Sequence, residues 1–516
     1  MNSRSIDKSY GKKACVLTVV SLIAKVVGAL YRIPLTNIIG AEGVGLYQLI
    51  FSIYALALAL TSAFSATLIS RQVSSYLALG DEDGARGYFA AALTDSLLSS
   101  ALVGAALFIF GEKIASAQGA AGGGIGYRVI APAVILVAVL SSLKGWFNGN
   151  MELFPSALSI MLEQGVKLLF GILLAYLFRD RGAAVACAAA LGGVTLSELA
   201  ATVTIGAVYF AKRRGKGYKR VPLRLVLKEG IALRFNGLIL PVSVFLDGLI
   251  IVRLLRIFGL GKEEGVAAYG IYSGAVNSLV NFPVVLVISL AVAVIPLIAR
   301  SKTTRDINTI KGKAALTLKL ALVISLPAML ALLLLAPKVI GLIYPVFSAE
   351  ERAVAVKLLS VGAGSVVFLS LTHIYSSLLQ AIGRADIAAE SLAVAVLVRL
   401  ILEVVLVPAI GILGIAVATL VCYALATLLS LLKWWQFTGR SENAIKTLAL
   451  ITASGGIMVL AILAPVMLVG NAFLSVILSA VIGAVVYFVA VLRLKVFSKG
   501  ELEAMPLSSL TTKIGR

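Results

Sequence analysis

Residues 14–39 read ACVLTVVSLIAKVVGALYRIPLTNII. This stretch is long enough to cross a bilayer, because a helical span needs about 20 apolar residues. Two cations, Lys25 and Arg32, interrupt it. Seven residues apart on a helix, their side chains point the same way, about 10 Å apart along the axis. Lys25 is close to mid-span and is predicted to face the protein interior, whereas Arg32 lies near the span end and either faces inward or snorkels to the headgroups.

Comparable apolar runs continue along the whole chain of 516 residues, which is 60% hydrophobic and 13% charged, with a mean hydropathy of +1.03. Only helices and closed barrels satisfy the backbone in lipid. We therefore predict an all-α, polytopic membrane protein of about fourteen transmembrane helices, with no sizeable soluble domain. The predicted spans are 14–39, 44–70, 86–110, 127–147, 154–178, 183–210, 232–255, 266–299, 312–336, 353–382, 386–409, 411–435, 446–469 and 472–492.

The formal net charge of +21 could suggest a nucleic-acid partner, but the location of the basic residues argues against one. They concentrate in the tails and loops that are cytoplasmic when both termini are placed in the cytoplasm, as the positive-inside rule expects. Segment 212–234 is the most basic loop and is predicted to rest on anionic membrane lipids. Its basic residues are Lys212, Arg213, Arg214, Lys216, Lys219, Arg220, Arg224, Lys228 and Arg234.

An internal repeat is visible in the second and eighth spans. The second begins GVGLY at residues 43–47 and ends LISR at 68–71; the eighth begins GVAAY at 265–269 and ends LIAR at 297–300. An even number of spans per copy keeps both copies in the same orientation.

The repeat predicts two pseudo-symmetric six-helix lobes, residues 1–211 and 231–437, joined by a basic cytoplasmic linker at 212–230. Residues 438–516 would hold two additional C-terminal helices and a cytoplasmic tail.

Motifs for catalysis are missing from the sequence. There is no phosphate-binding G-x-x-x-x-G-K-[ST] loop, and the single histidine, His373, offers no metal or Ser-His-Asp pattern. The cysteines Cys15, Cys187 and Cys422 have no paired spacing. We therefore expect neither an enzyme nor a metal or other cofactor.

Charged residues inside the spans are the candidate functional groups. Glu163 and Lys167 are four residues apart, as are Arg399 and Glu403. Either pair could be mutually neutralised or could take part in binding or a charge network. Asp247 has no local partner, so it pairs with a cation on another helix, stays protonated or holds a coupling ion.

Several other polar groups could line a cavity. Arg253 and Lys319 lie near span ends, where they either snorkel or bind a ligand. Asn277 and Asn281 precede Pro283, where a bent helix would expose carbonyl and amide groups.

Positive charge is in surplus in the first lobe, through Lys25, Arg32 and Lys167. This surplus predicts an anionic ligand, with phosphate or diphosphate the natural candidate. An inside-negative membrane potential could drive export of such an anion, at about 2.3 kcal/mol per charge per 100 mV. Coupling to a Na⁺ or H⁺ gradient is compatible with the sequence but is not required.

Residues 31–43, YRIPLTNIIGAEG, are followed by GLYQ at 45–48. This motif resembles the opening of the stage V sporulation protein B and MurJ-like branch of the multidrug/oligosaccharidyl-lipid/polysaccharide exporter superfamily. NFP at 281–283 and LQAIGR at 379–384 resemble motifs of the wider superfamily.

The resemblance implies a flippase in the bacterial cell membrane. It would move an undecaprenyl-diphosphate-linked cell-wall precursor, with lipid II as the first candidate, from the inner to the outer leaflet by alternating access. Lys25 and Arg32 match basic positions of the family's first span, and Asp247 matches an acidic position of its seventh. The family has Arg more often where this chain has Lys25.

Three alternatives remain open from the sequence. The protein could export other lipid-linked polysaccharide units, or it could be a cation-coupled multidrug exporter on the same scaffold. It could also be a non-transporting scaffold that recruits cell-wall synthesis proteins through its basic linker. A sporulation role would rest on the resemblance alone.

Overall fold

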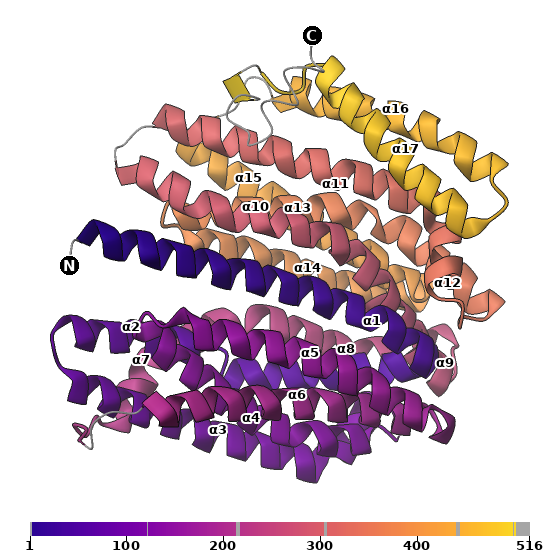
Figure 1. Ribbon diagram of the computed structural model, residues 1–516. Helices are drawn as coiled ribbons and strands as arrows, with labels where there is room; N and C mark the ends of the chain where they lie inside the picture. The colour runs from indigo at the N-terminus through magenta and orange to yellow at the C-terminus, as the bar shows by residue number, and fades with distance from the viewer. Residues whose placement is uncertain are drawn as a thin grey trace. The chain divides into compact units, whose positions relative to one another are not determined.

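The computed structural model describes residues 3–120, 122–212, 217–303, 307–439, 444–498 and 500–501. Within the helices, the side chains of some residues, Lys25 among them, lie outside this description. Every described secondary-structure element is a helix. The chain divides into two compact units, residues 1–274 and 275–516 (Figure 1).

The first unit contains α1 to α9. Its helices are α1 (Ser3–Thr61), α2 (Ser65–Ala78), α3 (Glu82–Ala117), α4 (Gly124–Gly149), α5 (Leu153–Phe178), α6 (Ala183–Lys212), α7 (Leu223–Gly237), α8 (Ile239–Phe258) and α9 (Lys262–Gly270), with a short 3₁₀ turn, η1 (Arg179–Arg181). A π-helical segment, η2 (Ile271–Val276), follows α9.

The second unit contains α10 (Asn277–Thr303), α11 (Ile307–Ile343), α12 (Ala349–Gly362), α13 (Gly364–Ala381), α14 (Ala385–Ile410), α15 (Leu413–Thr438), α16 (Ala444–Leu468) and α17 (Ala472–Arg493). Helices α16 and α17 form a hairpin, visible at the yellow end of the chain in Figure 1.

The predicted number of membrane-crossing helices is only partly matched by the described residues. Among the described residues, eleven helices are long and apolar enough to cross a membrane, or twelve if α12 and α13, bent by 43°, form one span. The predicted fourteen is therefore not confirmed. A total of fourteen would require two spans within α1. It would also require that α8, which carries Asp247, Arg253 and Arg256, cross the membrane.

Helix α1 shows why the count is ambiguous. A straight helix of 59 residues would be about 90 Å long, roughly three times the hydrocarbon core. Gly40 interrupts it with φ 70° and ψ −178°, a conformation that glycine adopts without a Cβ clash. The predicted spans 14–39 and 44–70 meet at this break, and the second arm ends at Thr61, before α2 begins at Ser65.

Small residues let the helices of the first unit approach closely. A Cβ on Gly193 of α6 would lie 2.3 Å from the Cα of Gly171 on α5, so the two backbones touch there. The two copies of the sequence repeat also meet: a Cβ on Gly45 would lie 2.1 Å from the carbonyl oxygen of Val266. Close packing thus joins the second arm of α1 to α9.

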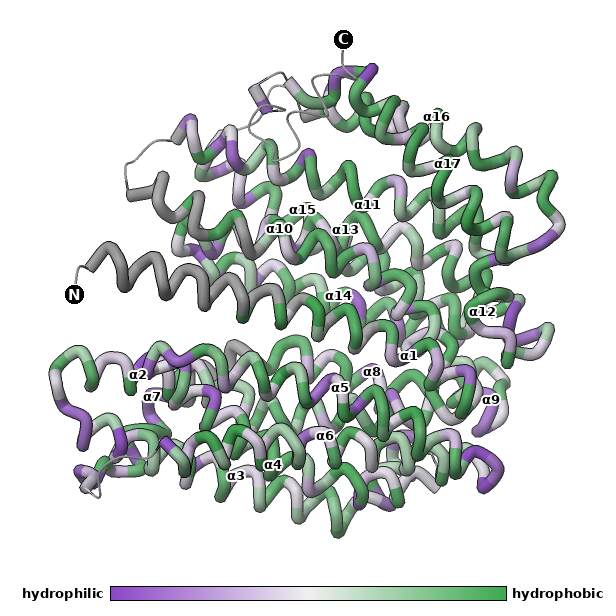
Figure 2. Tube along the Cα trace, viewed as in Figure 1, coloured by the Kyte–Doolittle hydropathy of each residue, from purple (hydrophilic) through white to green (hydrophobic). Residues whose placement is uncertain are grey.

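Hydrophilic residues of the first unit gather at helix ends, for example at the turn between α2 and α3, whereas the shafts are mainly apolar (Figure 2). This is the pattern of a multi-pass membrane protein. The orientation of the termini, the positions of the six-helix lobes and the linker boundaries remain predictions.

Candidate functional site

Charged side chains meet in the interior of the first unit. Lys144 of α4, Glu163 and Lys167 of α5, and Glu198 of α6 form this group, which we call the charged cluster together with Arg32 of α1. Each lies inside an apolar helix that could cross a membrane. Charges at such depth are costly and are usually functional.

Glu163 lies at the centre of the charged cluster. Its Oε2 lies 3.4 Å from Nζ of Lys144, and its Oε1 accepts a hydrogen bond of 3.0 Å from Nε2 of Gln164. Glu163 therefore pairs with a base on another helix. The alternative of local neutralisation by Lys167, one turn further along α5, is not what the structure contains.

Lys167 is held by aromatic faces instead. Its Nζ lies 5.4 Å from the ring centroid of Tyr31 and 5.5 Å from that of Phe51. Both distances are within the range of cation–π attraction. Arg32, Glu163 and Glu198 are its charged neighbours. A cation–π contact does not neutralise the cation as an ion pair with a carboxylate would, so a protonated Lys167 would still attract an anion.

Glu198 is only 7% exposed, and its Oε2 has no hydrogen-bond partner among the described residues. Its charged neighbours are Glu163, Lys144 and Lys167. The cluster therefore holds three bases against two acids. If all five are ionised, one positive charge is in surplus, which favours an anionic ligand.

An aromatic wall follows the second arm of α1. The rings of Tyr47 and Phe51 stack with centroids 5.7 Å apart, and Phe51 lies 5.5 Å from Tyr54. Glu163 and Glu198 are charged neighbours of Tyr54. The wall gives the charged cluster rigid, amphipathic surroundings.

The structure brings only some of the predicted residues together. Arg32, Lys167 and Glu163 belong to the charged cluster, and the side chain of Lys25 lies outside the described residues. Asp247 is buried in α8, and Arg253 on the same helix is exposed. Neither has a described contact with the cluster, so their predicted roles remain predictions.

The other predicted residues belong to the second unit. Asn281 donates a hydrogen bond of 2.7 Å to the carbonyl oxygen of Asn277. Arg399 and Glu403 form the expected ion pair, with Nε and Oε1 3.3 Å apart, and both are buried. Lys319 pairs with Glu501 at 2.8 Å, an acidic partner that the sequence did not indicate.

Lys144 is the functional candidate that sequence reasoning missed. It lies inside the predicted span 127–147, and this position in an apolar stretch was the available signal. Among the described residues, no group of three or more His, Cys, Asp or Glu side chains could hold a metal ion.

Comparison with known proteins gives two family matches. Residues 10–302 match the family model described as polysaccharide biosynthesis protein, and residues 242–405 match the MatE model.

Three curated relatives match over most of their length, and these three are from Bacillus subtilis (strain 168). The chain is 27% identical to the uncharacterized membrane protein YabM, with 99% of each chain covered. It is 24% identical to stage V sporulation protein B, over 82% of this chain and 83% of that protein. It is 23% identical to the lipid II flippase MurJ, over 94% of this chain and 95% of that protein.

Solved structures show the same fold. The inward closed conformation of lipid II flippase MurJ gives a TM-score of 0.68 at 15% identity, covering 92% of this chain and 98% of that one. An inward-facing multidrug resistance MATE family transporter gives a TM-score of 0.64 at 17% identity, covering 80% of this chain and 94% of that one. The predicted fold class is therefore confirmed.

Proposed function

The chain belongs to the polysaccharide biosynthesis protein family, within the multidrug/oligosaccharidyl-lipid/polysaccharide exporter superfamily, and from this we propose that it is a flippase for an undecaprenyl-diphosphate-linked cell-wall precursor. At the coarser level it is a multi-pass membrane protein of a superfamily of flippases and exporters. Lipid II is the first candidate substrate, because the relative named lipid II flippase MurJ aligns over nearly the whole chain.

The observation that carries the proposal is the charge balance of the charged cluster. Arg32, Lys144 and Lys167 outnumber Glu163 and Glu198, and Lys167 contacts two aromatic faces rather than a carboxylate. Cations at this depth suit a diphosphate, whose oxygens accept several charge-assisted hydrogen bonds.

The proposed cycle needs no chemical step by the protein. The diphosphate would sit at the charged cluster while the polyisoprenyl tail stays in lipid, and alternating access would carry the headgroup to the outer leaflet. A doubly charged headgroup moving outward gains about 4.6 kcal/mol per 100 mV of inside-negative potential. The membrane potential is thus a sufficient driving force in this proposal, and a Na⁺ or H⁺ gradient is the alternative.

The test is binding of purified protein to three ligands: lipid II, an undecaprenyl-linked teichoic-type precursor and a cationic dye. The comparison is repeated with Arg32→Ala and with Lys357→Met, which removes an exposed cation of α12 as the matched control. Tight lipid II binding that falls only with Arg32→Ala supports substrate and site together. Equal binding of both lipids broadens the substrate to lipid-linked polysaccharide units.

A cation-coupled multidrug exporter is the second candidate. The buried carboxylate of Glu198 favours it, since an acid at this depth could hold a proton, a metal cation or a cationic drug. Dye binding that is lost with Glu198→Gln, without any lipid binding, would favour this candidate. If the protein is folded but binds none of the three ligands, the result would favour a non-transporting scaffold that recruits cell-wall synthesis proteins.

A further inference from the structure

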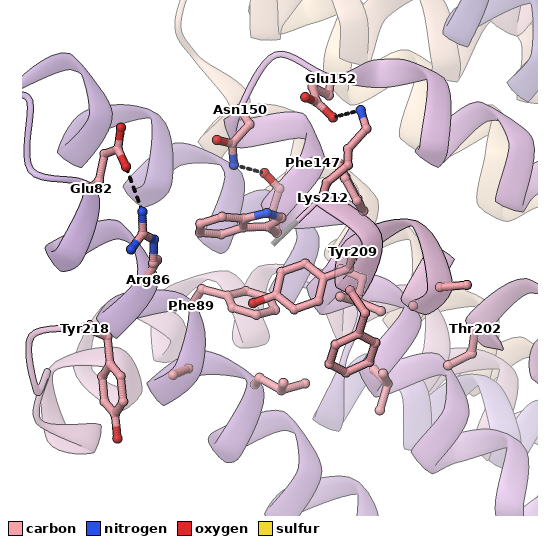
Figure 3. Close-up of a pocket in the computed structure, with 18 of the residues that line it drawn as sticks. Glu82, Arg86, Phe89, Phe147, Asn150, Glu152, Thr202, Tyr209, Lys212 and Tyr218 are labelled. Carbon is pink, nitrogen blue, oxygen red and sulfur yellow. Dashed lines mark hydrogen bonds and ion pairs between the residues drawn. The ribbon is translucent and has the colours of Figure 1, made fainter. Parts of the chain in front are cut away.

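A second place in the first unit has the shape of a binding site. A cavity of about 950 Å³ lies against the first turns of α3 and the last turns of α4 and α6, with Gly217 and Tyr218 of the linker at its edge (Figure 3). This volume is at the upper end of the range for small-molecule sites. None of the residues of the charged cluster lines it.

Aromatic side chains form the middle of this cavity. Ring centroids of Phe89 and Trp146 lie 5.1 Å apart, and Tyr209 lies 5.4 Å from Phe89 and 6.0 Å from Trp146. Phe210 and Val203 also line the cavity and are 69% and 60% exposed, so its wall continues onto the outer surface of α6. Tryptophan and tyrosine concentrate where spanning helices meet the membrane–water interface.

Charged residues stand at one end only. Lys212 lies 2.6 Å from Glu152, and Arg86 lies 2.7 Å from Glu82 (Figure 3). Nearby, Asn150 donates a hydrogen bond of 2.8 Å to the carbonyl oxygen of Trp146. The remaining walls, deeper in the helices, are mostly apolar, among them Leu93, Val139 and Leu143. The cavity is thus polar at the helix ends and apolar along the helix shafts.

We propose that this cavity binds a zwitterionic glycerophospholipid of the surrounding membrane. Its acyl chain would lie against Phe89, Trp146 and Tyr209. Its phosphate would accept a hydrogen bond from Lys212 and its ammonium would face Glu152, so that the headgroup replaces the contact between these two side chains.

Charge complementarity favours a zwitterionic phospholipid over an anionic phospholipid and over a diphosphate-linked saccharide. The two cations and two carboxylates that line the cavity balance each other, which matches a headgroup carrying one charge of each sign. A purely anionic phospholipid would leave both carboxylates facing a phosphate. A diphosphate-linked saccharide would bring still more anionic oxygens beside the two carboxylates, and its site is proposed at the charged cluster instead.

The test is native mass spectrometry of the full chain released from detergent, with phosphatidylethanolamine and phosphatidylglycerol added in turn. Gly206→Leu fills the cavity: Gly206 lines it, and a Cβ added there meets no atom within 4 Å. Gly456→Leu on α16 is the matched control, because its added Cβ also meets open space.

The wild-type chain and Gly456→Leu should each retain one phosphatidylethanolamine, with affinity at least about fivefold above that for phosphatidylglycerol, and Gly206→Leu should lose about tenfold in that affinity. If all three chains retain phosphatidylethanolamine equally, the cavity is not the lipid-binding site. Equal affinity for both lipids, or a preference for phosphatidylglycerol, overturns the headgroup assignment.

Fluorescence gives a readout that does not depend on the Gly206 variant. Replacing Trp434 and Trp435 by Phe leaves Trp146 as the remaining tryptophan of the chain's three. Phosphatidylethanolamine brominated on its acyl chains should then quench Trp146 saturably at low mole fraction. Quenching that rises only in proportion to bulk lipid overturns the proposal.

Discussion

Replacing Lys167 by methionine should separate transport from stability. Methionine keeps the length and apolar stem of lysine but removes the charge. Its two cation–π contacts, at 5.4 and 5.5 Å, contribute about 0.5–1 kcal/mol each, so losing them weakens the fold by about 1–2 kcal/mol. The variant also removes the cost of burying a cation, which offsets much of that loss, while the lost repulsion from Arg32 is set against the lost attraction to Glu163 and Glu198. The free energy of unfolding should change by no more than about 1 kcal/mol.

The effect on an anionic ligand should be much larger. At about 4 Å, a unit charge interacts with another at about 1 kcal/mol in water and about 4 kcal/mol at an effective dielectric constant of 20. A diphosphate beside Lys167 would lose an interaction in this range, and 1.4 kcal/mol is already a factor of ten in affinity. Substrate affinity should therefore fall at least about fivefold.

The assay is flipping of fluorescent lipid II in proteoliposomes, read by quenching from outside, with thermal unfolding measured in parallel. Lys167→Arg keeps the charge and should retain most of the activity, while Lys357→Met should behave like the wild type. Wild-type flipping by Lys167→Met would refute the role of this cation. A large drop in melting temperature would instead show that Lys167 is structural.

Three further perturbations test other parts of the structure. Lys338 donates to the carbonyl oxygens of Val466 in the last turn of α16 and Val469 just after it, at 2.6 and 3.2 Å, and to a serine hydroxyl of α17 at 2.7 Å. Lys338→Met should therefore lower the free energy of unfolding by about 2 kcal/mol, measured by thermal denaturation. A hydrogen bond from Lys219 holds the pKa of Asp81 below its usual range, so this contact is present above the unfolded pKa of about 3.9 and is lost as pH falls through the lower folded value. Hydrogen-exchange protection of linker amides 217–221, taken relative to the intrinsic rate at each pH, should fall only below about pH 4 in the wild type but already at neutral pH in Asp81→Asn. Equal protection in both chains would contradict this. Gly193→Leu should prevent α5 and α6 from packing and yield no folded monomer by size exclusion, because its Cβ alone would lie 2.3 Å from the Cα of a glycine on α5.

Helix positions were the part of the fold that the sequence predicted best. The predicted span 154–178 corresponds to α5, Leu153–Phe178, and 472–492 corresponds to α17, Ala472–Arg493. Both are apolar runs with polar or charged residues at their ends, and hydropathy alone locates such boundaries.

Bends and breaks were predicted less well. The break of α1 at Gly40 falls in the predicted gap between spans 14–39 and 44–70, where Gly40, Glu42 and Gly43 interrupt the apolar run. The 43° bend between α12 and α13 lies inside the single predicted span 353–382, where hydropathy carries no signal.

The sequence predicted the ion-pair partners of some charged residues but not of others. The local rule for residues four apart holds for Arg399 and Glu403, which pair within α14. It fails for Glu163, whose partner Lys144 is nineteen residues earlier on α4. A sequence gives the face of a helix on which a charge lies, but not which neighbouring helix that face meets.

The choice of Lys144 as the partner of Glu163 has a consequence for the site. A carboxylate neutralises a cation, whereas an aromatic face stabilises it and leaves its net charge unchanged. If Glu163 were paired with Lys167, the mid-span cation of α5 would be cancelled. With Glu163 engaged by Lys144 and Lys167 held against Tyr31 and Phe51, the cation near the middle of α5 is not cancelled by this carboxylate. Lys144→Met should then release Glu163 to neutralise Lys167 and reduce anion binding, although Lys144 itself need not touch the ligand.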